Sequence, residues 1–109
     1  MEKLYYIGLD IHKKTISYCV KEIDGTIVEE GKIEAERKAL NKWLDRLPGS
    51  WKGAMEATMF TGWIYDYLKP HAVDLKVGHP AMIEAITAAK KKNDRSDAAK
   101  LADLLRVNL

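Results

Sequence analysis

The chain has 109 residues, a net charge of +2 and a hydrophobic fraction of 47%. These values are typical of one globular domain and exclude a histone-like polycation, so any affinity for nucleic acid must come from local patches. No apolar run approaches the ~20 residues of a membrane-spanning helix, and the start of the chain does not resemble a signal peptide, so no membrane partner is expected. The single cysteine, Cys19, lies in a strand pattern. It predicts a buried thiol and is typical of a cytoplasmic protein.

The first part of the chain predicts three antiparallel strands, over residues 4–10, 15–23 and 26–33. The first is an apolar run that ends in Asp10, and the second alternates apolar and polar residues. Asp24-Gly25 between the second and third runs is a strong hairpin signal. The third run carries several charges, as is typical of a strand at the edge of a sheet.

Beyond residue 34 the apolar spacing alternates between that of helices and that of strands. It predicts helices over residues 34–47, 60–68, 82–86 and 101–105, and strands over 51–55 and 73–77. Thr58 or Thr61 is expected to cap the helix over 60–68. Since strands joined by single helices lie parallel through right-handed crossovers, the sheet order becomes 3-2-1-4-5. The order βββαβαβα therefore predicts an RNase H-like α/β fold, with a mixed five-stranded sheet and helices on both faces.

Four carboxylates are expected to converge at one end of this sheet. Asp10 ends the first strand and Glu56 ends the fourth, so both acids lie at the same edge if those strands are parallel neighbours. Asp94 and Asp97 share one helix face, because they stand three residues apart. That face continues into Leu101, which must pack on the sheet, so both aspartates are expected to point inward.

Clustered carboxylates repel one another unless a cation compensates them. Ligands with oxygen donors only favour Mg²⁺ or Mn²⁺, and the three histidines lack cysteine partners for zinc. Two ions ~3.5–4 Å apart stabilise the attacking and leaving oxygens of a phosphoryl transfer. Asp10 is predicted to bridge both ions, with Glu56, Asp94 and Asp97 completing the ligand shells. The alternatives stay open: Asp94 and Asp97 could mark a helix N-terminus, Glu56 a solvated strand end and Asp10 a turn.

Two basic segments flank the predicted acidic site. Beside a metal site they are suited to hold a phosphate backbone, although a solvated basic loop is the simpler interpretation. The residues concerned are Lys13, Lys14, Lys90, Lys91, Lys92 and Arg95.

Three blocks of sequence resemble the signature blocks of the DEDD transposases, in the insertion-sequence family related to the Piv DNA invertase. The blocks are Gly8-Leu9-Asp10-Ile11-His12-Lys13, Met55-Glu56-Ala57-Thr58 and Asn93-Asp94-Arg95-Ser96-Asp97-Ala98. The resemblance implies that residues 1–109 form a RuvC-like amino-terminal domain. It further implies that Asp10, Glu56, Asp94 and Asp97 are the catalytic, metal-binding acids of a DNA transposase.

Full-length members of that family continue into a second domain with a catalytic serine, which has no counterpart in this chain. They are understood as RNA-guided recombinases, so the resemblance implies DNA, a structured guide RNA and a homo-oligomer as partners of the full-length form. We therefore expect the isolated chain to be incapable of complete strand exchange.

Two alternative functions remain at this point. Actin-like or sugar-kinase-type ATP-binding proteins also begin with Gly-x-Asp and a hairpin, but their first turn usually holds glycines that cradle phosphate. The turn His12-Lys13-Lys14 has none. The other alternative is a non-catalytic nucleic-acid-binding module, which would not depend on divalent metal.

Overall fold

The computed structural model of the chain describes residues 3–78 and 97–107. Its elements are β1 (Tyr5–Ile11), β2 (Thr15–Lys21), β3 (Ile27–Glu34), α1 (Arg37–Arg46), β4 (Trp51–Glu56), α2 (Thr61–Leu68), the 3₁₀ helix η1 (Lys69–His71), β5 (Asp74–Gly78) and α4 (Asp97–Arg106). The helix predicted over residues 82–86 lies outside the described residues.

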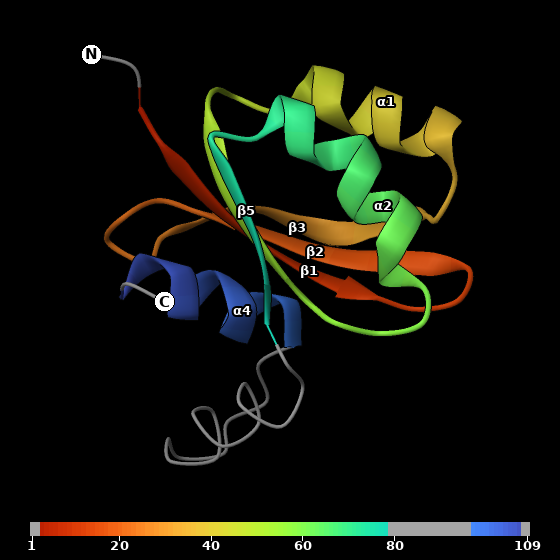
Figure 1. Ribbon diagram of the computed structural model, residues 1–109. Helices are drawn as coiled ribbons and strands as arrows, with labels where there is room; N and C mark the ends of the chain where they lie inside the picture. Colours follow the sequence, from red (N-terminus) through yellow and green to blue (C-terminus); the bar gives the residue numbers. More distant parts are fainter. Residues whose placement is uncertain (1–2, 79–96, 108–109) are drawn as a thin grey trace.

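The five strands form one mixed sheet in the order β3-β2-β1-β4-β5, which confirms the predicted topology. β1 is central: it pairs antiparallel with β2 and parallel with β4, and β4 pairs parallel with β5. Helices α1 and α2 cover one face of the sheet and α4 covers the other (Figure 1). The chain therefore has the RNase H-like arrangement that its pattern of strands and helices predicts.

The hairpin between β2 and β3 forms at the predicted place. Gly25 has φ +95°, a conformation that glycine adopts without steric cost. The backbone N–H of Glu22 donates to the carbonyl of Thr26 at 2.9 Å, and the Asp24 carboxylate accepts from the N–H of Thr26 at 2.9 Å. The hairpin sets the register of β3, which is an edge strand as its charges predict.

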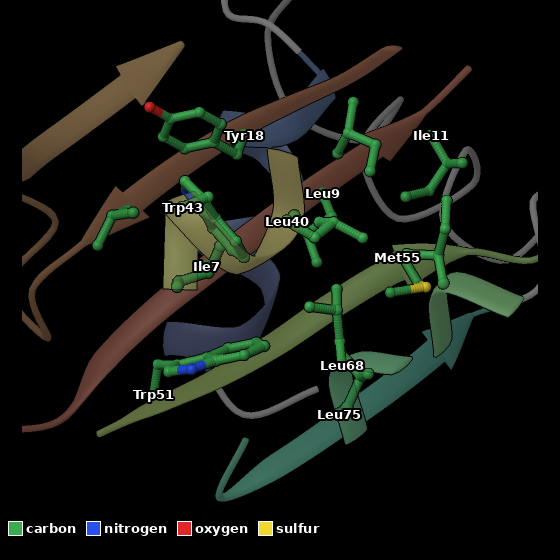
Figure 2. Close-up of a cluster of buried hydrophobic side chains, with 13 residues drawn as sticks. Ile7, Leu9, Ile11, Tyr18, Leu40, Trp43, Trp51, Met55, Leu68 and Leu75 are labelled. Atoms are coloured by element: carbon green, nitrogen blue, oxygen red, sulfur yellow. The ribbon is translucent and has the colours of Figure 1, made fainter. Parts of the chain in front are cut away.

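The main core lies between the sheet and the α1/α2 layer (Figure 2). Alternate residues of β1, namely Ile7, Leu9 and Ile11, are buried on this face because successive strand side chains point to opposite faces. Trp43 of α1 is fully buried and packs edge-on against Trp51 of β4, with ring centroids 5.9 Å apart. Both tryptophans therefore belong to this core.

The face under α4 is built from small residues. Gly8 of β1 approaches the helix so closely that a Cβ placed on it would stand 1.8 Å from the carbonyl oxygen of Ala98 and 2.6 Å from the nitrogen of Ala102. Ala54 of β4 is buried on the same side, and Cys19 of β2 is buried against the first turn of α4. The helix can approach the strands this closely only because a glycine lies beneath it.

A buried ionic network joins the carboxyl-terminal half of α4 to β2. Lys21 Nζ donates to Asp103 Oδ1 at 2.8 Å, and the lysine side chain is only 2% exposed. Arg106 donates to the same oxygen from Nε at 3.1 Å and from a terminal guanidinium nitrogen at 2.9 Å. It also donates to the carbonyl of Ile23 at 2.8 Å. These bonds hold α4 against the β2–β3 hairpin and set its direction across the sheet.

Candidate metal-binding site

Asp10 lies one residue before the end of the central strand. Its side chain points to the α4 face, because it stands two residues after Gly8 on the same strand. The carboxylate is 19% exposed, and its Oδ2 lies 3.0 Å from Nε2 of the exposed His12. The N–H of His12 donates to the carbonyl of Thr15 at 2.8 Å, which closes the β1–β2 turn. The carboxylate is thus held at the edge of the sheet with access to solvent.

Glu56 is the last residue of β4 and the neighbour of Asp10 across the β1–β4 pairing. The paired residues run to Leu9 and Met55, so Asp10 and Glu56 are the next residues on the two strands. Adjacent strands lie ~4.8 Å apart. Glu56 is half-buried, and it points to the same face as Ala54, which packs against α4. The topology therefore brings these two carboxylates to the same edge and the same face of the sheet.

The direction of α4 brings its amino terminus toward this edge. Cys19, opposite Gly8 in the sheet, lies against Ala98 and Ala99, whereas Lys21, opposite Tyr6, binds Asp103. The helix therefore runs antiparallel to β1. The amino terminus of α4 therefore lies near the carboxyl end of β1, where Asp10 is located.

Asp97 is the first residue of α4, and its carboxylate is exposed rather than buried against the sheet. The side chain is 73% exposed, and Oδ1 lies 3.8 Å from Lys100 Nζ. The inward orientation that its spacing from Leu101 suggested is not seen, although Leu101, on the same helix face, is buried. Asp97 is exposed at the first residue of the helix, where the packed part of α4 begins. Its predicted role as a ligand stays a prediction.

The remaining predicted site residues lie outside the described part of the chain: Asp94, Lys90, Lys91, Lys92 and Arg95. Over residues 3–78 and 97–107, no three His, Cys, Asp or Glu side chains form a group that could hold a metal ion. Among the predicted ligands, Asp10 and Glu56 are the pair that the sheet brings together. Two adjacent carboxylates are oxygen donors of the kind that Mg²⁺ and Mn²⁺ prefer, so the donor set fits such an ion.

Lys13 and Lys14 are exposed in the turn that follows β1. The carbonyl of Lys14 accepts from the N–H of Ala35 at 2.9 Å, so this turn is anchored to the end of β3. Both lysines stand within four residues of Asp10, at the edge predicted from the sequence. The turn therefore carries two exposed positive charges at the end of β1 where Asp10 lies.

A threonine pair organises the turn that follows Glu56. Thr61 Oγ1 donates to the Glu56 carbonyl at 2.8 Å and lies 3.0 Å from Thr58 Oγ1. Neither threonine caps α2 as the sequence suggested, because the N-cap is Phe60 and carries no side-chain cap bond. The two hydroxyls stabilise the turn instead of the helix terminus.

The chain is similar to known transposases. A family model of IS110-type DEDD transposases, described as "Transposase", matches residues 7–109. The chain belongs to the DEDD transposase family. The match includes Asp10 and Glu56, and it extends through α4.

A curated relative of this DEDD transposase chain is the transposase for insertion sequence element IS1533 of Leptospira borgpetersenii. The two are 32% identical over 111 residues, which cover 97% of this chain and 32% of the relative. The chain thus spans about a third of the length of the relative that it matches.

No helix within residues 3–78 and 97–107 is long and apolar enough to cross a membrane.

Proposed function

We propose that this chain is the metal-binding catalytic domain of a DNA transposase, acting on DNA phosphodiesters. The observation that carries the proposal is the parallel pairing of β1 with β4, which brings Asp10 and Glu56 to one edge and one face of the sheet. Membership of the DEDD transposase family supports the same assignment and favours it over an ATP-binding protein.

In this proposal Asp10, Glu56, Asp94 and Asp97 would hold Mg²⁺ or Mn²⁺. Bound divalent ions would stabilise negative charge on the attacking and leaving oxygens of a phosphodiester. Neighbouring residues of the chain orient the carboxylates for this role. His12 Nε2, 3.0 Å from Oδ2, fixes the rotation of the Asp10 carboxylate, and the central strand holds its backbone rigid.

The basic side chains beside the carboxylates are proposed to hold DNA. Lys13 and Lys14 are exposed at the same edge of the sheet, and phosphate contacts from lysine supply most of the sequence-independent affinity of such proteins. Lys90, Lys91, Lys92 and Arg95 are proposed to extend this surface. The basic side chains would neutralise the phosphates of the DNA backbone, while the carboxylate site acts on one phosphodiester.

For a longer protein that carries this domain, we propose DNA recombination guided by a structured RNA, within a homo-oligomer in the cytoplasm. This part of the proposal follows from the resemblance to full-length members of the family. The matched region covers about a third of the curated relative, so the domain alone is proposed to be insufficient for complete strand exchange.

A Mn²⁺ titration followed by thermal unfolding tests the proposal. The wild-type domain should be stabilised by Mn²⁺, because an ion that binds only the folded state raises its stability. Asp10→Asn and Glu56→Gln should remove this shift. Asp45→Asn is the matched control, since Asp45 is an exposed carboxylate on α1, across the sheet from the site. DNA binding with no response to Mn²⁺ would instead indicate a non-catalytic nucleic-acid-binding module.

A further inference from the structure

Glu56 stands at a position where its backbone is fixed from two sides. The N–H of the following residue, Ala57, donates to the carbonyl of Gly78 on β5 at 2.9 Å. The carbonyl of Glu56 itself accepts from Thr61 Oγ1 at 2.8 Å. Both polar groups of the peptide that joins Glu56 to Ala57 are therefore held, one by the neighbouring strand and one by a side chain from the first residue of α2.

The hydroxyl of Thr61 is buried, and its hydrogen bonds have one consistent direction. Thr61 is 5% exposed, and its single proton goes to the Glu56 carbonyl. Its oxygen must then accept both from the backbone N–H of Thr58 at 3.0 Å and from the Thr58 hydroxyl at 3.0 Å. The Thr58 hydroxyl in turn accepts from the N–H of Phe60 at 3.2 Å. The chain of donors thus ends at Glu56.

This network has no role in capping the helix, since Phe60 is the N-cap of α2 and makes no side-chain cap bond. What it determines is the orientation of the peptide plane at Glu56. Because that plane contains the Cα and carbonyl carbon of Glu56, it constrains, together with the strand pairing before it, the direction in which the side chain leaves the sheet toward Asp10 on the neighbouring strand. Groups that orient a ligand in this way change metal affinity although they do not touch the metal.

We propose that Thr61 is a positioning residue for the carboxylate of Glu56, setting the metal affinity of the site through a hydrogen bond to the Glu56 backbone. This inference rests on the proposed function, because it takes Glu56 as a metal ligand. The hydroxyl is the required group, and the methyl group of Thr61 contributes only packing.

The test compares Thr61→Val, which keeps the shape but removes the hydroxyl, with Thr61→Ser, which keeps the hydroxyl. Mn²⁺ affinity is measured from the decrease of the free-ion signal in electron paramagnetic resonance, at a temperature where circular dichroism shows every variant folded. Thr61→Val should weaken Mn²⁺ binding about 10–100-fold, as removal of an outer-shell partner does in other metal sites. Thr61→Ser should restore most of the affinity.

Leu44→Ala is the control for stability, because Leu44 packs from α1 on the other side of the sheet. It should lower the unfolding temperature and leave the Mn²⁺ affinity unchanged. If Thr61→Val does not fold, Thr58→Val removes the upstream hydroxyl of the same network and should weaken Mn²⁺ binding in the same direction.

The outcomes separate this inference from the proposed function. If the wild type binds Mn²⁺ and Thr61→Val binds it with equal affinity, the positioning role alone is overturned. Wild-type protein that does not bind Mn²⁺ would overturn both. A decrease of affinity in Thr61→Val that Thr61→Ser does not share supports the inference, because a purely structural role would lower stability without this dependence on the hydroxyl.

Discussion

Gly8 of β1 and Ala98 of α4 are in backbone contact: a Cβ on Gly8 would stand 1.8 Å from the Ala98 carbonyl oxygen. This contact sets where the first turn of α4 lies on the sheet, two residues before Asp10 on the same strand. The glycine of the Gly-x-Asp sequence therefore has a structural role that is separate from any ligand. It allows the helix that begins with Asp97 to lie directly on the strand that carries Asp10.

Gly8→Ala should destabilise the domain by about 1–3 kcal/mol or more, as expected when a methyl group is forced into a packed interior. The atoms that a Cβ would meet are backbone atoms, so the whole helix must move. Urea unfolding followed by circular dichroism measures the effect. Gly62→Ala is the control: Gly62 lies in α2 with no atom within 4 Å of a new Cβ, so its substitution should be neutral or stabilising. Equal stability of Gly8→Ala and the wild type would contradict the contact.

The buried network of Lys21, Asp103 and Arg106 gives a second prediction. Asp103→Leu should cost about 3–5 kcal/mol, because it leaves the Lys21 ammonium buried without its carboxylate. Lys21→Met should cost less, since Arg106 still pairs with Asp103 at 2.9 Å. The double variant, Lys21→Met with Asp103→Leu, should recover part of the stability. Denaturant unfolding of all three variants forms a double-mutant cycle, and strictly additive costs would show that the pair is not coupled.

The thiol of Cys19 gives a prediction for alkaline pH. Burial raises its pKa from 9.0 to about 11. Since the folded thiol keeps its proton where the unfolded thiol has lost it, its contribution to stability is complete below pH 9.0 and is lost as the pH rises to about 11. The decrease should reach about 2–3 kcal/mol, at about 1.36 kcal/mol per unit.

Cys19→Ala isolates this effect, because the other titrating groups are unchanged. As the pH rises across that range, the unfolding free energy of the wild type should decrease relative to that of Cys19→Ala. A difference that stays constant with pH would mean that the thiol is not buried in the folded state.

The lysines beside Asp10 should contribute to DNA affinity. Lys13→Gln with Lys14→Gln should weaken binding to duplex DNA of any sequence. A plot of log affinity against log salt concentration has a negative slope. The double variant should make that slope shallower, by about 0.9 for each phosphate that the protein no longer neutralises. Fluorescence anisotropy at several salt concentrations gives the slope. The control is Lys38→Gln with Lys42→Gln, two exposed lysines on α1 over the other face. If this pair reduces the slope equally, the attraction is general and not centred on the site.

The strand order could be predicted because it depends on local patterns and on the geometry of crossovers. Asp24-Gly25 determines one hairpin, and a single helix before β4 and another before β5 require parallel neighbours. The positions of Asp10 and Glu56 follow from that order alone. For this reason the pairing of two acids at one edge was accessible from the sequence.

The details that could not be predicted depend on contacts between distant segments. The alternation in β2 assigns Lys21 to a polar face, but α4 covers that face, and the partner of Lys21 lies 82 residues away. The exposure of Asp97 could not be predicted from its spacing, because Asp97 shares a helix face with the buried Leu101 but is the first residue of α4. The bond from Thr61 to Glu56 depends on the turn between β4 and α2, whose path a helix-capping rule does not describe.

Anomalous scattering from a crystal of the domain soaked in Mn²⁺ would locate the metal directly. We predict a peak bound by the carboxylates of Asp10 and Glu56, at the carboxyl end of β1 and β4, with Asp94 or Asp97 joining the coordination. The peak should disappear in Asp10→Asn crystals. Mn²⁺ bound elsewhere on the domain at saturating concentration, with no metal at either Asp10 or Glu56, would contradict the proposed site.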